Sequence, residues 1–210
     1  MIPADNLLIF ALAALGLVLS PGPNMIYLIS RSISQGRRAG LLSLIGVALG
    51  FLMHIMLVSF GLTAVFLTIP VAYEILRWLG VGYLLYLAWE GVKPGSASPF
   101  QTRHLSNDSD FKLVRMGFVT NALNPKVAVF YLSFFPQFTR PEYGSLISQN
   151  LELGFTQLLI SAFINTIIIF SAALAAKWFQ ARPTYVSVQK WIMSGVLTGL
   201  AVRMAMDKGK

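Results

Sequence analysis

The chain has 210 residues, of which 56% are hydrophobic and only 11% are charged, and its net charge is +8. Soluble domains carry about a quarter charged residues, so this composition excludes a water-soluble globule and indicates an integral membrane protein. The basic residues lie in short segments between apolar runs, where membrane topology places them, and we therefore expect no nucleic-acid partner. The sequence has no cysteine and no HxxxH pattern, so we also expect no thiol chemistry, no metal site and no cofactor.

Six apolar segments follow one another along the chain, and most are close to the length of about 20 residues that crosses a bilayer as a helix. They cover residues 6–30, 41–68, 69–88, 116–138, 151–176 and 191–206, and the last of them is the shortest. We therefore expect an all-α integral membrane protein with about six transmembrane helices. Pro70 is a suitable first residue for the third helix, because a missing N–H does no harm there.

Two polar stretches predict the orientation of these segments. A basic loop with Arg31, Arg37 and Arg38 follows the first segment, and residues 91–115 form the longest polar stretch. Lys and Arg concentrate in cytoplasmic loops, so we expect both stretches in the cytoplasm and the N-terminus outside. Apart from the C-terminal tail, the opposite loops contain a single basic residue, Arg140.

Two of the segments contain helix breakers. The sequence Ser-Pro-Gly-Pro-Asn at residues 20–24 interrupts the first, and Asn-Pro-Lys at residues 124–126 interrupts the fourth. Three crossings reverse the direction of the chain, so residues 1–90 and 116–210 predict two inverted three-helix repeats joined by the loop 91–115. Broken helices at matching positions of inverted halves indicate a transport site near the bilayer midplane. The alternative is a pair of ordinary proline kinks, which membrane helices tolerate.

Lys126 lies near the centre of its apolar segment, where a charge is costly and marks a candidate functional residue. No acidic residue is predicted at a matching depth, and an unpaired lysine suits a ligand that carries a carboxylate. The alternatives are a neutral lysine, or one that contacts only backbone carbonyls. Asn24, Asn121 and Asn124 lie beside the two breaks and offer both donors and acceptors.

His54 lies near the middle of the second segment, in line with Gly46 and Gly50 on one helix face. Such a histidine relays a proton or accepts a hydrogen bond from an ammonium group; alternatively, it is neutral and bonded to a neighbouring helix. The two glycines admit a close neighbour, which is either another span of this chain or a second copy in a homodimer.

Taken together, several motifs resemble those of the LysE/RhtB amino-acid exporter family, in the expected order and over nearly the whole chain. They are residues 20–24, the Gly-Arg-Arg-Ala-Gly turn at 36–40, the Gly-x3-Gly-x3-His pattern at 46–54, residues 124–126 and Phe-Pro-Gln-Phe at 135–138. The resemblance implies a multi-pass protein of the bacterial inner membrane that exports amino acids and is driven by protons. It also implies that the functional residues here are Pro21, Gly22, Pro23, Asn24, Asn124, Pro125 and Lys126.

Some members of that family carry an acidic residue just after the second glycine of the Gly-x3-Gly pattern, whereas this chain has Phe51. The difference argues against a cationic substrate and favours a neutral amino acid of the homoserine, threonine or leucine type. The alternatives are a cation or metal exporter, or a membrane subunit without transport activity. No constellation of nucleophile, acid and base indicates an enzyme.

Overall fold

The computed structural model describes residues 2–20, 22–62, 70–93, 107–180 and 183–206. Within these ranges the chain forms helices and turns and no β-strand, so the all-α prediction is confirmed. The longer helices are α1 (Ala4–Leu19), α2 (Pro23–Met56), α4 (Pro70–Val92), α5 (Asp110–Ala122), α7 (Leu146–Gln180) and α8 (Pro183–Met206). Shorter ones are α6 (Pro125–Val129), the π-helical η1 (Leu57–Leu62) and η2 (Phe130–Phe134), and the 3₁₀ turns η3 (Phe135–Gln137) and η4 (Pro141–Tyr143).

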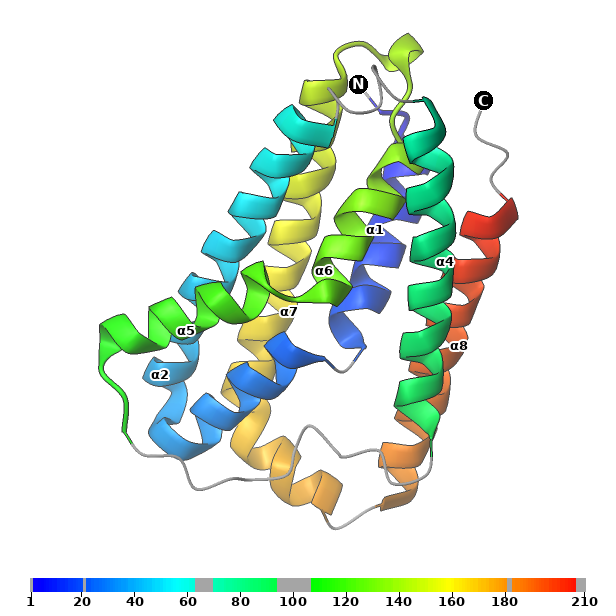
Figure 1. Cartoon of the computed structure of the whole chain (residues 1–210). Helices are drawn as coiled ribbons and strands as arrows, with labels where there is room; N and C mark the ends of the chain where they lie inside the picture. The colour runs from blue at the N-terminus through cyan, green and yellow to red at the C-terminus, as the bar shows by residue number, and fades with distance from the viewer. Residues whose placement is uncertain (1, 21, 63–69, 94–106, 181–182, 207–210) are drawn as a thin grey trace.

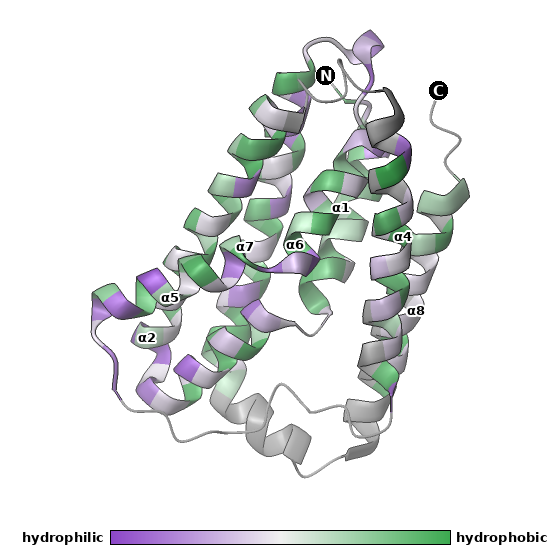
Figure 2. Ribbon diagram, in the orientation of Figure 1, coloured by the Kyte–Doolittle hydropathy of each residue, from purple (hydrophilic) through white to green (hydrophobic). Residues whose placement is uncertain are grey.

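The surface is apolar while several polar side chains lie inside, the reverse of a soluble protein. Figure 2 shows hydrophobic residues recurring along the long helices. Large side chains that are more than half exposed include Leu8, Leu12, Ile45, Phe60, Leu79, Leu159 and Phe163. Soluble monomers rarely expose apolar patches on this scale. Buried polar residues include Asn121, Asn124, Lys126, Gln157 and Asn165, and polar groups inside a membrane protein mark pathways or sites.

Two helical stretches in the described ranges are long and apolar enough to cross a bilayer, namely Pro23–Gly61 and Leu146–Ala172. Ala4–Leu19 is apolar but shorter. The start of α1 and the end of α8 lie at the same end of the molecule (Figure 1). The total of six spans and their grouping into two inverted repeats stay predictions.

The predicted basic loop after the first segment is wrong, because α2 runs through all three arginines. A sharp turn at Gly36 divides α2 into two straight parts, and the backbone there has φ 84°. This left-handed conformation is accessible to glycine without steric cost. Arg31 is consequently a buried helix residue, and its Nη1 pairs with Asp108 Oδ2 at 2.5 Å.

Both predicted helix breaks are confirmed. α1 ends at Leu19 and α2 begins at Pro23, while α5 ends at Ala122 and α6 begins at Pro125. In each case a proline occupies the first turn of the new helix, where its fixed φ and missing N–H are tolerated. Pro70 likewise begins α4, as predicted.

Other boundaries differ from the prediction. α5 begins at Asp110, inside the predicted polar stretch 91–115 and before the predicted start at 116, and α8 begins at Pro183 rather than 191. Polar residues occupy the first turns of both helices, and hydropathy alone does not reveal this continuation.

Glycines bring α2 and α5 close together. A Cβ on Gly46 would collide with the carbonyl of Val114, and one on Gly50 would collide with Asn121. A Cβ on Gly117 of α5 would likewise collide with the carbonyl of Ser43 and approach the backbone nitrogen of Val47. Small residues at a helix interface allow this approach. The glycine face predicted from the sequence is therefore used within the chain.

Candidate functional site

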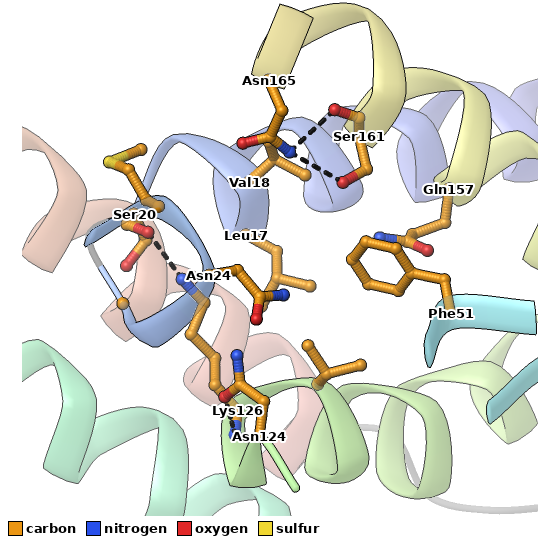
Figure 3. Close-up of a pocket in the computed structure, with 13 residues that line it drawn as sticks. Leu17, Val18, Ser20, Asn24, Phe51, Asn124, Lys126, Gln157, Ser161 and Asn165 are labelled. Carbon is orange, nitrogen blue, oxygen red and sulfur yellow. Dashed lines mark hydrogen bonds between the residues drawn. The ribbon is translucent and has the colours of Figure 1, made fainter. Parts of the chain in front are cut away.

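A small cavity lies between the two helix breaks and α7 (Figure 3). Its volume is about 30 Å³, enough for a water molecule or two and far too small for an amino acid. Its walls come from the end of α1, both parts of α2, the start of α6 and the middle of α7. The lining residues are Leu17, Val18, Ser20, Gly22, Asn24, Met25, Phe51, Asn124, Lys126, Val127, Gln157, Ser161 and Asn165.

Lys126 joins the two breaks. Its side chain is 7% exposed and its Nζ donates a hydrogen bond of 2.6 Å to the carbonyl oxygen of Ser20. Ser20 directly follows α1, where the carbonyl end of a helix favours a cation. Gly22 allows this approach, because a Cβ there would lie 3.2 Å from the same Nζ. The two breaks, far apart in sequence, therefore share one buried contact.

Asn124 holds the start of α6 in place. Its Oδ1 accepts a hydrogen bond of 3.1 Å from the backbone N–H of Lys126, as an N-cap residue does. Its own N–H donates to the carbonyl of Asn121 at 3.0 Å. These two bonds fix the backbone from which the Lys126 side chain extends toward Ser20.

Two buried polar atoms in the cavity wall have no hydrogen-bond partner in the described part of the chain. They are Asn24 Oδ1, an acceptor, and Gln157 Nε2, a donor. Gln157 is fully buried, and its Oε1 accepts a bond of 2.7 Å from the hydroxyl of Tyr131, which leaves only the amide nitrogen free. A buried polar group without a partner costs about 1–3 kcal/mol, and a ligand that pairs with both atoms would remove that cost.

The remaining wall is divided between polar and apolar residues. On α7, Asn165 Nδ2 donates to the carbonyl and the hydroxyl of Ser161 at 2.8 and 3.0 Å. The apolar part consists of Leu17, Val18, Met25, Phe51 and Val127. In Figure 3, Phe51 lies beside Gln157, across the cavity from Ser20 and the amine of Lys126.

His54 and Asn121 lie outside this cavity, between α2 and α5. The Nε2 of His54 is 3.3 Å from the backbone carbonyl oxygen of Asn121, and a carbonyl accepts only, so this bond requires a proton on Nε2. The imidazole stacks on Tyr131 with ring centroids 5.5 Å apart. Asn121 Nδ2 donates to the Val47 carbonyl at 2.5 Å. His54 thus contacts the second break through Asn121 rather than through the cavity.

The structure brings together only some of the residues predicted for the site. Gly22, Asn24, Asn124 and Lys126 line the cavity. Pro23 and Pro125 are exposed and outside its wall, and Pro21 lies outside the described residues. The lysine contacts a backbone carbonyl, which is one of the alternatives that the sequence leaves open.

Sequence reasoning missed part of the cavity wall. Gln157 and Ser161 belong to it, and they precede Asn165 at intervals of four residues, which places all three on one face of α7. This polar line in an apolar segment was the available signal. No sequence pattern predicts that Phe51 lines the cavity, because this depends on which helices pack against it.

A second group of charges lies where α2 meets the start of α5. Arg31 and Lys112 both pair with Asp108, each at 2.5 Å, and Arg38 pairs with Asp110 at 2.6 Å. The hydrogen bond from Lys112, and secondly the charge of Arg31, lower the pKa of the Asp108 carboxyl against the opposing effect of burial. No group of three or more His, Cys, Asp or Glu side chains that could hold a metal ion occurs among the described residues.

Comparison with known proteins gives a match over most of the chain. Residues 15–208 match the family described as LysE type translocator. The chain belongs to the LysE type translocator family. The resemblance found in the sequence motifs is therefore confirmed, and the protein is a membrane translocator. No solved structure matches the chain.

The curated relatives of this LysE type translocator include named efflux proteins. The leucine efflux protein of Enterobacter sp. (strain 638) is 28% identical over 95% of both chains. The homoserine/homoserine lactone efflux protein of Salmonella typhi is 33% identical over 78% of this chain and 79% of its own. An uncharacterized membrane protein of Pseudomonas aeruginosa is 27% identical over 93% of both.

Proposed function

We propose that this translocator exports neutral amino acids, or small metabolites with the same zwitterionic group, from the cytoplasm across the bacterial inner membrane. It is a multi-pass secondary transporter with two inverted three-helix halves, and the proton gradient drives it. The relatives named for leucine and for homoserine efflux support this substrate class. The cavity between the two breaks is the substrate site.

One observation carries the proposal: a buried lysine whose amine contacts a single carbonyl, in a cavity with an unpaired acceptor and an unpaired donor. A buried charge with so little compensation is expensive, and a substrate carboxylate would compensate it. The amine of Lys126 then leaves the Ser20 carbonyl for that carboxylate. The freed carbonyl and Asn24 Oδ1 accept hydrogen bonds from the substrate ammonium group, and Gln157 Nε2 donates to the carboxylate.

The cavity also favours a neutral side chain. No Asp or Glu occurs among the described residues that line it, so a cationic side chain would meet no counter-charge. The apolar wall with Phe51 and Val127 suits an aliphatic or short hydroxylated group instead. Because the cavity has only about 30 Å³, substrate entry requires movement, and the broken helices are where the two halves rock during alternating access.

His54 is the residue that we propose for proton coupling. Histidine is the side chain whose unperturbed pKa lies nearest neutral pH, and the bond of His54 to the Asn121 carbonyl connects it to the backbone that Asn124 also contacts. Protonation of the imidazole therefore acts on the second break. A His54→Gln variant should still move substrate but should lose the response of its efflux rate to a pH gradient.

The test is efflux from proteoliposomes loaded with a mixture of radiolabelled amino acids, with and without a proton gradient, against protein-free liposomes. The proposal expects gradient-dependent loss of leucine, homoserine or threonine and retention of lysine and arginine. Retention of every amino acid under both conditions would contradict it. Loss of lysine or arginine alone would overturn the assignment of a neutral substrate.

A further inference from the structure

A second and larger cavity is lined by residues from the start of α1 and the end of α8. These two helix ends lie at the same end of the molecule (Figure 1). Its volume is about 540 Å³, which is within the range of about 300–1,000 Å³ for small-molecule sites. Asn6, Gln137, Arg140 and Tyr143 give it polar walls, and Val202 and Met206 of α8 contribute an apolar one. It is therefore large enough for an amino acid, whereas the central cavity is too small for one.

Two chain segments contribute residues to the walls of both cavities. α1 has Asn6 in the outer wall and Leu17 in the central wall. The segment from α6 to η3 has Lys126 in the central wall and Gln137 in the outer wall. Figure 1 shows both segments running toward the same end of the molecule.

A cluster of phenylalanines joins these two segments. The ring of Phe10 on α1 lies 5.7 Å from Phe130, 5.3 Å from Phe135 and 5.4 Å from Phe138, centroid to centroid. Phe10 is fully buried, and Phe138 also lines the outer cavity. Part of the cluster is carried by the π-helical η2, a conformation that is frequent at functional sites. Along both segments the rings of Phe10, Phe130 and Phe135 lie between the residues of the central wall and those of the outer wall, so a solute that followed these segments would meet them as a barrier.

Arg140 is the cationic group of the outer cavity. Its backbone N–H donates to Gln149 Oε1 at 3.0 Å, and its carbonyl accepts from Gln149 Nε2 at 2.8 Å. Gln149 is 1% exposed, so the backbone of Arg140 is fixed from inside the protein. Its guanidinium has no hydrogen-bond or ion-pair partner within the described ranges, and it lines the cavity.

We propose that the outer cavity is an exit site that binds the carboxylate of the departing amino acid through Arg140, beyond the phenylalanine barrier at Phe10. The inference rests on the proposed export of amino acids. Arginine matches a carboxylate with two parallel hydrogen bonds, and Gln137 and Asn6 offer further polar contacts to the solute. A site of this kind holds the solute after the barrier closes behind it and before it enters the medium.

The experiment measures exchange in proteoliposomes that are loaded with radiolabelled L-leucine or L-homoserine and sorted for one orientation. Unlabelled amino acid is added at the face with Arg140, and the external concentration that gives half-maximal exchange is determined. Arg140→Gln should raise that concentration about tenfold, the size expected for one charge-assisted pair. Arg140→Lys should raise it less, since the charge remains.

Three controls make the result specific. Glu142→Gln, two residues away on exposed η4, should leave the half-maximal concentration unchanged. L-leucinamide, which lacks the carboxylate, should compete equally against wild type and Arg140→Gln. Vesicles of phosphatidylcholine alone should give the same tenfold change as vesicles that contain phosphatidylglycerol.

An unchanged half-maximal concentration in Arg140→Gln would overturn the exit site. A change that occurs only with phosphatidylglycerol would also overturn it and would assign Arg140 to lipid phosphate. If wild-type vesicles move neither amino acid, the proposed function itself has failed. If wild-type vesicles move them and Arg140→Gln behaves identically, only the exit site has failed.

Discussion

The two helix breaks share a composition of proline and asparagine but differ in how their polar groups are satisfied. At the second break, Asn124 caps the backbone N–H of Lys126 and donates to the Asn121 carbonyl. At the first break, Gly22 precedes α2 without a side-chain cap, and Asn24 Oδ1 has no partner in the described part of the chain. The polar groups of the second break are thus paired within that break, whereas the Ser20 carbonyl of the first break is paired by Lys126.

From this difference we propose separate roles for the two breaks. In the proposed function, the second break is the support that presents the amine of Lys126, and the first supplies the acceptors that this amine satisfies while no substrate is bound. A zwitterion can replace both partners at once, because it carries one group for each break. Substitutions at the first break, at the second break and in the cavity wall should therefore differ in how strongly they reduce efflux and in whether they alter its rate or its substrate preference.

The largest effect is expected from Lys126→Met, which keeps most of the side-chain volume and removes the amine. We predict at least about a 100-fold loss of efflux rate, because the substrate loses its charged partner and the Ser20 carbonyl is left unpaired. Efflux from proteoliposomes measures it, with thermal unfolding in detergent as a check on folding. Lys112→Met, at a half-exposed lysine of α5, is the control. Efflux at the wild-type rate in a folded Lys126→Met protein would remove the lysine from the site.

Gly22→Ala tests the contact between the breaks without touching the charge. The new Cβ would lie 3.2 Å from Lys126 Nζ and should displace it from Ser20. We predict a loss of efflux rate of about tenfold, equivalent to one hydrogen bond to a charged group. Gly82→Ala is the matched control, because a Cβ at this exposed position of α4 meets nothing within 4 Å. Equal rates for the two variants would show that the close approach is unimportant.

Phe51→Ala tests the wall that faces Lys126 across the cavity. Phe51 is 4% exposed, and its truncation should admit larger side chains, so the ratio of phenylalanine to leucine efflux should rise about fivefold, a change of about 1 kcal/mol. Competition between the two labelled amino acids measures this ratio. Phe155→Ala, which removes a half-exposed ring of α7, should leave the ratio unchanged. A ratio that is the same in both variants would exclude Phe51 from substrate selection.

The smallest expected effect is on the pH dependence of Tm, through the ion pairs of Asp108 outside the cavity. Because the pKa of Asp108 is lowered in the folded protein, its ion pairs stabilise the fold fully above the unfolded pKa of about 3.9. That stabilisation is lost as the pH falls through the lower folded value. The Tm of wild type should therefore exceed that of Asp108→Asn by a constant amount at pH 5 to 7, and the difference should shrink only below about pH 4. A difference that grows on acidification would contradict this assignment.

Much of the fold could be predicted from local signals, because proline and glycine act on their own backbone. Pro23, Pro70 and Pro125 each begin a helix where the sequence places one. The glycines at 46 and 50 indicate a close neighbour, although not that the neighbour is α5. Arg31 was assigned to a loop, because a buried arginine is expected only when its partner, Asp108, is known.

The site could be predicted only in part, because its decisive contact joins residues 106 positions apart. Sequence patterns identify Lys126 as an expensive charge and Ser20 as part of a break, but no pattern links them. The same applies to Phe51 and Gln157, which come from different helices and meet only in the cavity. His54 was expected beside the substrate, whereas in the structure it lies outside the cavity wall, against the backbone carbonyl of Asn121.

The most direct test of the account is substrate binding to purified protein, with an amino acid that the efflux assay identifies as transported and with its carboxamide. If the substrate carboxylate replaces the Ser20 carbonyl at Lys126, wild type should bind the amino acid at least about tenfold more tightly than the carboxamide. Lys126→Met should bind the two compounds equally. A Lys126→Met protein that still prefers the carboxylate would contradict the central claim.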